Sequence, residues 1–232
     1  MPVEMVQRPV MVISCRVFES SLCKWLGATP VTFLDQGLHD TPKQLTGEIQ
    51  TALEALPEPS LVLIGYGLCG NGLHGLQSGQ HTLIIPRADD CITLYLGSQA
   101  ARRQQLEADP GVYFLTIGWL EGANNPMSNY EKHVVVYGEE EANWLLQTMY
   151  GHYSRLVFIA SSQEELTAYR PRAQAIAHFT REHLGWIYEE RMGSEEYLQR
   201  LLAAPRDPLG IGDDFLLVPP GGQVRQDMFI HV

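Results

Sequence analysis

The feature of this sequence that most constrains its fold is a regular alternation of short apolar runs with helix-like segments. In the first half, the apolar runs cover residues 9–14, 31–34, 60–64, 82–85 and 112–117. Short runs of β-branched and aliphatic residues, separated by helical stretches, are typical of buried parallel strands. The sequence therefore predicts an α/β protein with a mostly parallel, Rossmann-like sheet that has helices on both faces.

One helix in the first half has clear start signals. Thr41 is a natural N-cap, Pro42 occupies the first helical position, and Gln44 has the spacing of a capping box. Apolar residues then recur on one face of the predicted helix. A second helix is expected near residues 94–106.

The second half continues the alternation less regularly. Strands are expected at residues 156–160, 186–188 and 215–218, and helices at 138–150, 171–183 and 194–203, with 123–137 as a loop that contains one further strand at most. Two readings fit this pattern. The chain either forms two α/β lobes, residues 1–122 and 123–232, or residues 123–232 continue the same sheet.

Composition excludes several classes of protein. Sixteen Lys and Arg stand against twenty-seven Asp and Glu, giving a net charge of −11, which argues against a nucleic-acid groove and an anionic membrane surface. The apolar runs are far shorter than the roughly 20 residues that span a bilayer, and the N-terminus has no signal-peptide pattern. We therefore expect a cytoplasmic protein. Four cysteines do not make a disulfide scaffold.

Metal-ligating residue types follow the first four predicted strands. They are Cys15, His39, Cys69 and Cys91. In an open parallel sheet the carboxyl ends of the strands share one edge, where ligand crevices form. Three thiolates and an imidazole suit zinc, and three thiolates alone can hold an iron–sulfur cluster with one open iron. The sequence leaves zinc and the cluster undecided, and inert packed cysteines also fit, since there is no C-x-x-C pair.

The loop after the third run, GYGLCGNG, allows a second interpretation. Gly65, Gly67 and Gly70 match the dinucleotide pattern G-x-G-x-x-G, and Gly72 follows. These glycines could hold the phosphates of a nucleotide or the tail of a corrinoid. Against this interpretation, the next segment is a poor helix former. The alternative is a turn whose glycines let the backbone approach another part of the chain.

Polar residues after the fourth run are the candidate catalytic groups. Arg87, Asp89 and Asp90 precede Cys91, and one of the two carboxylates could orient a ligating histidine, act as a base or cap the next helix. Trp119, after the fifth run, could cover the crevice as a cofactor contact or belong to the core.

These motifs as a set resemble a prokaryotic family known as domain of unknown function 1638. The resemblance is best in the first 120 residues and rests on Cys15, on residues 34–39 (LDQGLH), 65–72 (GYGLCGNG), 86–94 (PRADDCITL) and 97–98 (GS), and on Gly118 and Trp119. It implies an association with anaerobic one-carbon metabolism and corrinoid-dependent methyltransferases. The family has no activity that would settle the function.

The leading hypothesis is thus a metal–thiolate protein, zinc or iron–sulfur, that serves corrinoid-linked methyl transfer. Its partners would be a small molecule or corrinoid methyltransferase proteins. The main alternative is an accessory protein that binds a nucleotide or corrinoid through the glycine loop without a metal. A plain interaction protein and nucleophilic catalysis by Cys69 also remain open. Whether the protein is an enzyme, and whether residues 123–232 cover the crevice or form a homodimer surface, is not fixed by the sequence.

Overall fold

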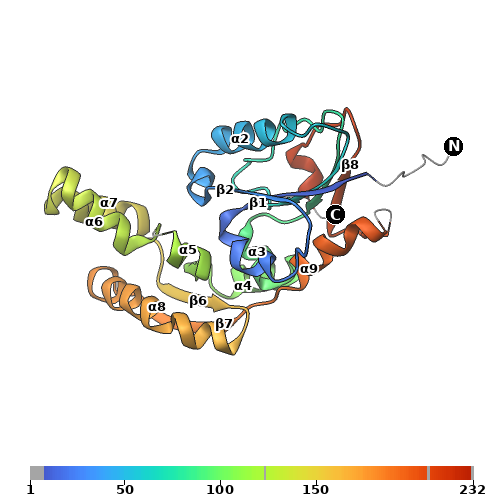
Figure 1. The fold of residues 1–232 in the computed structure, drawn as a ribbon. Coiled ribbons are helices and arrows are strands. Elements are labelled where there is room, and N and C mark those ends of the chain that lie inside the picture. Colours follow the sequence, from blue (N-terminus) through green and yellow to red (C-terminus); the bar gives the residue numbers. More distant parts are fainter. Residues whose placement is uncertain (1–7, 123, 208–209, 231–232) are drawn as a thin grey trace. The chain divides into compact units, whose positions relative to one another are not determined.

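The computed structural model describes residues 8–122, 124–207 and 210–230. The chain divides into two compact units, each built around its own sheet (Figure 1). Unit 1 comprises Met1–Gln99 and Glu195–Val232, and unit 2 comprises Ala100–Ser194. The α/β class expected from the sequence is confirmed.

Unit 1 contains a five-stranded sheet in the order β2-β1-β3-β4-β8. The strands are β1 (Val10–Cys15), β2 (Val31–Leu34), β3 (Leu61–Gly65), β4 (Thr82–Pro86) and β8 (Phe215–Val218). The first four are parallel, and β8 pairs antiparallel with β4. All five residues of β3 are buried, because it lies at the centre of a sheet covered on both faces.

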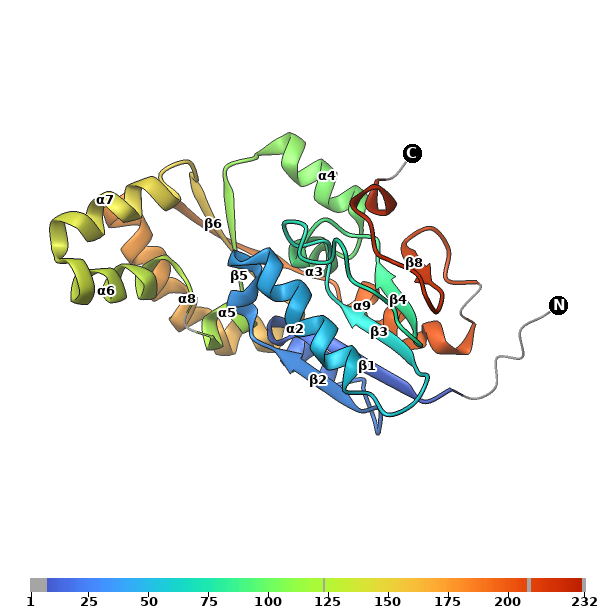
Figure 2. The same ribbon diagram turned by 90° about the horizontal axis from the view of Figure 1, so that it is seen from above.

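Helices cover both faces of this sheet. Helix α2 (Pro42–Glu54) lies on one face, and α3 (Cys91–Leu96) and α9 (Glu196–Ala203) lie on the other (Figures 1 and 2). Helix α2 buries Leu45, Ile49 and Leu53 on a single face, as its periodicity predicts. The short elements of unit 1 are η1 (Arg16–Phe18), α1 (Glu19–Cys23), η2 (Gln36–Asp40), η3 (Ala204–Arg206) and η4 (Gln226–Phe229).

Unit 2 has a parallel three-stranded sheet in the order β5-β6-β7. Its strands are β5 (Val112–Thr116), β6 (Arg155–Ala160) and β7 (Ile187–Met192). Its helices are α4 (Gln99–Ala108, whose first residue belongs to unit 1), α5 (Ile117–Glu121), α6 (Pro126–Tyr137), α7 (Glu139–Tyr150) and α8 (Gln163–Leu184). Helices α6 and α7 form an antiparallel hairpin (Figure 2).

The segment expected to be a loop with a possible strand is helix α6, so that prediction is wrong. Asn125 caps the helix, and its side chain and that of Ser128 form a reciprocal capping box, with Pro126 at the first position. The valines that suggested a strand lie in the last turn, and Val135 is 86% exposed. The start signals therefore override the β propensity of these residues.

Three further expectations differ in detail. The helix near residues 94–106 is two helices, because Gly97 adopts a left-handed conformation (φ 84°) that ends α3. Helix α8 begins after Ser162, with Pro171 inside it rather than at its start. Thr41 does precede α2, but its side chain makes no capping bond, because its hydroxyl donates to Gln44 instead.

The division of the chain also differs from a boundary at residue 122. Strand β5 pairs with β6 and so belongs with the later strands, while β8 returns to the edge of the first sheet beside β4. Unit 2 is thus an insertion between α3 and α9. No helix within the described ranges is both long and apolar enough to cross a membrane.

Candidate functional site

The strand order of unit 1 has a topological switch point, the place where ligand sites form at the carboxyl edge of open α/β sheets. The chain leaves β1 toward β2 on one side, whereas β3 and β4 lie on the other, so the topological switch point falls between β1 and β3. Cys15 is the last residue of β1, Cys69 lies in the loop after β3, and Cys91 is the first residue of the helix after β4. All three cysteines therefore follow strands at or next to the switch point.

Gly65 allows β1 and β3 to approach at this point. It pairs in register with Ser14, and a Cβ at Gly65 would lie 2.6 Å from the Ser14 Cβ. The buried Ser14 hydroxyl donates to the Gly65 carbonyl at 3.2 Å. Any larger residue at position 65 would push β3 away from the end of β1, where Cys15 lies.

Gly67 has the same role between the loops that follow β3 and β4. A Cβ at Gly67 would lie 2.8 Å from the Ala88 carbonyl oxygen and 2.9 Å from the Asp90 amide nitrogen. The close approach lets the Leu68 amide donate to the Ala88 carbonyl at 2.8 Å, and the Cys69 amide to the Asp89 carbonyl at 2.9 Å. These two bonds fix the loop of Cys69 against the residues just before Cys91.

The backbone at Cys69 is itself in an uncommon conformation. Cys69 (φ 46°), Gly70 (φ 62°) and Asn71 (φ 73°) all lie in the left-handed region. Residues other than glycine are disfavoured in this conformation, and they keep it only where surrounding contacts hold the backbone in place. The position of the Cys69 thiol beside the loop that follows β4 thus depends on a locally strained backbone.

The three thiols interact with one another. Burial is the main cause that raises the pKa of Cys15 to about 11, that of Cys69 to about 12, and that of Cys91 well above its usual value. The charge of Cys15 further raises the pKa of Cys69, and the charges of Cys69 and Cys15 both raise that of Cys91. At neutral pH all three are protonated thiols, and the site would strongly resist ionising them together.

Backbone amides partly offset this cost. The pKa of Cys15 is lowered by the amide of Val17, and that of Cys69 by the amides of Gly67 and Cys91. Amides that donate to sulfur favour the thiolate. Asp90 acts in the opposite direction on two of the thiols, because its charge raises the pKa of both Cys69 and Cys91. The site thus has donors for thiolates in place but lacks sufficient positive charge to stabilise them.

Tyr66 is a further member of the site that sequence reasoning missed. Its hydroxyl is buried and has no hydrogen-bond partner of ordinary geometry among the described residues. Burial raises its pKa far above the usual range, and so do the charges of Cys15 and Cys69. A tyrosine between two glycines at a strand end, inside the G-Y-G of the motif, is the signal that could have indicated it.

His39 does not offer a ring nitrogen to the thiols as it stands. Its Nδ1 lies 2.7 Å from the Gln36 carbonyl oxygen, and its Nε2 lies 2.9 Å from an Asp40 carboxylate oxygen. Among the residues that the structure describes, no group of three or more His, Cys, Asp and Glu side chains could hold a metal ion. A tetrahedral zinc site with the expected four ligands is therefore not preformed.

The acidic pair after β4 has separate structural partners. Asp90 caps α3, because its carboxylate accepts from the Thr93 amide at 2.8 Å and from the Thr93 hydroxyl at 2.9 Å. Asp89 accepts from the Gln99 side chain at 2.8 Å. The Arg87 amide donates to the Asp214 carbonyl at 2.7 Å. Of these three candidate catalytic residues, Asp90 has a charge that raises the pKa of both Cys69 and Cys91.

The remaining glycines of the motif leave little room for a phosphate. A Cβ at Gly72 would lie 2.5 Å from a Leu45 side-chain carbon, so this position is filled by the packing of α2. Gly70 is more open, with only a Pro42 carbon at 3.8 Å. No helix begins directly after the motif, since residues 71–75 form turns. Trp119 is a buried residue of α5 and belongs to unit 2.

The fold and site define an α/β protein with three cysteines at the carboxyl edge of its larger sheet, at or next to the switch point. The model of one protein family, described as a protein of unknown function (DUF1638), matches residues 33–202. The chain belongs to that family, which confirms the resemblance seen in the motifs. The match includes Cys69 and Cys91 and begins after Cys15. No curated protein and no solved structure matches the chain.

Proposed function

We propose that Cys15, Cys69 and Cys91 bind a metal–thiolate centre, and that this centre is an iron–sulfur cluster. The observation that carries the proposal is the placement of the three cysteines at the ends of three adjacent parallel strands, β1, β3 and β4. The loop of Cys69 is hydrogen-bonded to Asp89, two residues before Cys91. The left-handed backbone at Cys69 and the close approach that Gly67 permits hold this loop against the residues just before Cys91.

A cluster suits this arrangement better than a single zinc ion. Thiolates around one zinc lie about 3.8 Å apart, as follows from tetrahedral bonds of about 2.3 Å. In the part of the chain that the structure describes, no three His, Cys, Asp or Glu side chains form a group ready to hold a single metal ion. A cluster spreads its thiolates over several metal atoms, so three sulfurs can interact electrostatically without converging on one point. It also needs no imidazole, in agreement with the engaged ring of His39.

Positive charge from the bound metal would resolve the electrostatic conflict of the site. The thiols would lose their protons on binding, and the amides of Val17 and Gly67 would then donate to thiolate sulfur. Hydrogen bonds to sulfur are among the means by which proteins set the reduction potential of such centres. With three protein thiolates, a four-iron cluster would keep one iron open for an exogenous oxygen ligand.

Nucleophilic catalysis by Cys69 receives little support. A catalytic thiol needs a lowered pKa and an adjacent base, whereas the pKa of Cys69 is raised to about 12. The metal-free alternative, a nucleotide or corrinoid held by the glycine loop, is also weaker. Gly65, Gly67 and Gly72 are each explained by contacts within the protein.

The setting of the centre follows from the family resemblance alone. We assign it to corrinoid-linked methyl transfer in the cytoplasm, where the cluster would pass electrons to a corrinoid protein or bind a small molecule at its open iron.

The test is metal and sulfide analysis of the full chain after anaerobic purification and reconstitution. Single Cys→Ser variants at positions 15, 69 and 91 should each lose iron and sulfide, together with the brown visible absorption. Cys23→Ser is the matched control. Cys23 is exposed at the end of α1 in the same unit, so its removal should leave the metal content unchanged.

Each outcome decides between the forms of the proposal. Stoichiometric iron and sulfide that depend on the three cysteines support the cluster. Colourless protein with stoichiometric zinc supports a single-ion centre and overturns the cluster. Wild-type protein with no more iron, sulfide or zinc than a folded triple Cys→Ser variant overturns the metal–thiolate proposal altogether.

A further inference from the structure

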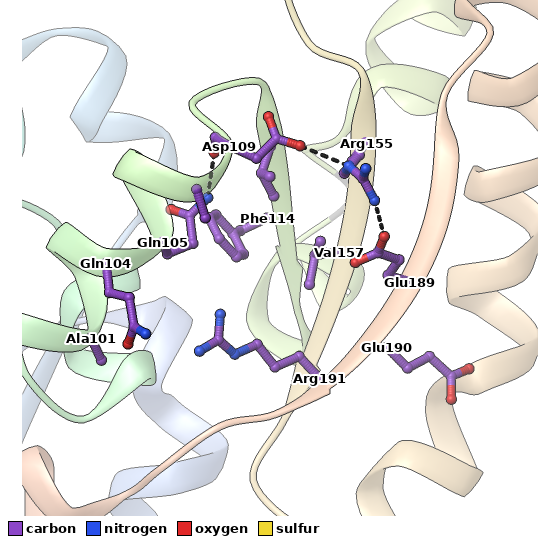
Figure 3. A pocket seen from close by; sticks show the side chains of 12 residues that line it. Ala101, Gln104, Gln105, Asp109, Phe114, Arg155, Val157, Glu189, Glu190 and Arg191 are labelled. Atoms are coloured by element: carbon purple, nitrogen blue, oxygen red, sulfur yellow. Dashed lines mark hydrogen bonds and ion pairs between the residues drawn. The ribbon is translucent and has the colours of Figure 1, made fainter.

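Unit 2 contains a cavity of about 540 Å³ that no part of the thiol site uses. Its floor is one face of the β5-β6-β7 sheet, from which alternate side chains project (Figure 3). The strand register places Phe114 beside Val157 and Val157 beside Glu189, so these side chains form one row across the floor. The volume lies within the range of small-molecule sites.

Helix α4 forms one wall of the cavity. The lining residues of this helix are Ala101, Gln104, Gln105 and Ala108. Their spacing of three and four residues places them on one helical face. The small side chains of Ala101 and Ala108 occupy little of the cavity. Gln104 extends its amide into it (Figure 3). Helix α8 packs on the same sheet through β6 and β7, where Arg170 holds Glu190.

The carboxylates that line the cavity already have arginine partners. Arg155 forms an ion pair with Asp109 at 2.7 Å and a second with Glu189. Glu190, the remaining carboxylate of the lining, is held by Arg170 through two hydrogen bonds of 2.8 Å. Every acidic side chain that lines the cavity is therefore already engaged by an arginine.

Arg191 is the lining cation that forms no ion pair with the carboxylates of the lining. Its side chain is exposed, and within the described residues it has no hydrogen bond or ion pair. Figure 3 shows its guanidinium extended into the cavity, between Gln104 and Phe114. The side chain of Gln104, in α4, likewise makes no hydrogen bond within the described ranges. In a chain with far more acidic than basic residues, a cation without an ion-pair partner in the described part of the chain is available to an external anion.

We propose that this cavity binds a small organic anion, with its carboxylate or phosphate on Arg191 and Gln104 and its flat apolar body on Phe114 and Val157. A guanidinium offers paired N–H donors that match two oxygens of such a group, and the Gln104 amide adds a further donor. Val112 and Val157 with the ring of Phe114 provide an apolar surface beside the charge, the combination typical of ligand sites.

The experiment measures binding to the full chain by calorimetry, with adenosine monophosphate as the phosphate probe and indole acetate as the carboxylate probe. Adenosine and indole are their neutral counterparts. At least one anion should bind with an affinity that falls as salt increases, and its neutral counterpart should bind more weakly. Which of the two anions binds better distinguishes a phosphate ligand from a carboxylate ligand.

Variants locate the binding. Arg191→Gln should raise the Kd by about tenfold or more, as expected for the loss of a charge-assisted contact. Arg191→Lys, which keeps the charge but not the planar fork, should give an intermediate Kd and covers the case in which the glutamine variant misfolds. Arg181→Gln is the matched control. This residue is an exposed arginine near the end of α8 that does not line the cavity.

The proposal is overturned if neither anion binds, or if Arg191→Gln and Arg191→Lys both bind as the wild type does. Failure of the thiol proposal would be seen separately. The cavity residues belong to unit 2 and the three cysteines to unit 1, so a folded triple Cys→Ser variant should keep its affinity for the anion.

Discussion

Replacing Gly67 with alanine should destabilise unit 1 by an amount that the geometry of the two loops determines. The added Cβ would lie 2.8 to 3.0 Å from three backbone atoms of Ala88 and Asp90. Real Cβ atoms do not approach backbone this closely, so the loops after β3 and β4 must separate. Their separation breaks the amide bonds that Leu68 and Cys69 donate across the gap.

The magnitude follows from these contacts. Two backbone hydrogen bonds contribute about 1 kcal/mol each, and overpacking a close contact costs about 1–3 kcal/mol. Because separation relieves part of the overlap as the bonds break, we expect a net loss of about 2–4 kcal/mol in the free energy of unfolding. The strained backbone at Cys69 would relax at the same time, since the bonds that hold it are gone.

The assay is urea unfolding, with Gly47→Ala as the matched control. Gly47 lies in the interior of α2, and a Cβ there meets nothing within 4 Å. The control should therefore gain about 0.5–1 kcal/mol, because alanine is the better helix former. A Gly67→Ala protein that unfolds within about 0.5 kcal/mol of the wild type, less than a single backbone hydrogen bond contributes, would refute the reasoning.

Three further predictions concern pH and helix capping. Burial lowers the pKa of His81, so the folded protein binds fewer protons than the unfolded chain as the pH falls. The stability that neutral His81 contributes is full above about pH 6.5 and is lost as the pH falls through the folded pKa. His81→Asn, which keeps an acceptor for the Ser60 amide, should reduce this loss of stability in acid, as measured by urea unfolding at several pH values. The pKa of Glu190 is lowered mainly by its hydrogen bonds with Arg170. Glu190→Gln should therefore lower the free energy of unfolding by up to about 1 kcal/mol at pH 7, and should not change it once the pH is below the folded pKa of the carboxyl. An equal loss of stability at both pH values would contradict the pairing. Asp90→Ala should lose about 1 kcal/mol with the cap of α3, whereas Asp90→Asn, which still accepts from Thr93, should stay near the wild type in thermal unfolding.

The sequence predicted the larger sheet well because its signals are local. Each of the runs that became β1 to β4 is short, apolar and bounded by polar or glycine residues, and the rule that carboxyl ends share an edge then places Cys15, Cys69 and Cys91 together. The pairing of distant strands was beyond such signals. Nothing near Phe215 indicates that β8 returns to β4, because that choice depends on an edge left open by residues far away in the chain.

The sequence predicted which edge of the sheet the cysteines occupy, but not the orientation of the histidine ring. His39 follows the second run as a ligand would, but the short helix η2 directs its ring to Gln36 and Asp40, a side-chain orientation that spacing does not encode. The cavity of unit 2 gave no sequence signal for a different reason. Arg191 and Phe114 meet only through the register of three strands, and an alternating strand with charged residues is indistinguishable from an ordinary exposed edge.

The position of β8 has a consequence for how the protein is made. Ile84 of β4 is paired with Leu217, and all of unit 2 is translated between them. While the ribosome synthesises that insertion, the nascent chain carries an unpaired apolar strand edge, which is a template for association with other chains. We therefore expect premature termination after unit 2 to yield an aggregation-prone fragment, and a slow late step in refolding to be the closure of this edge.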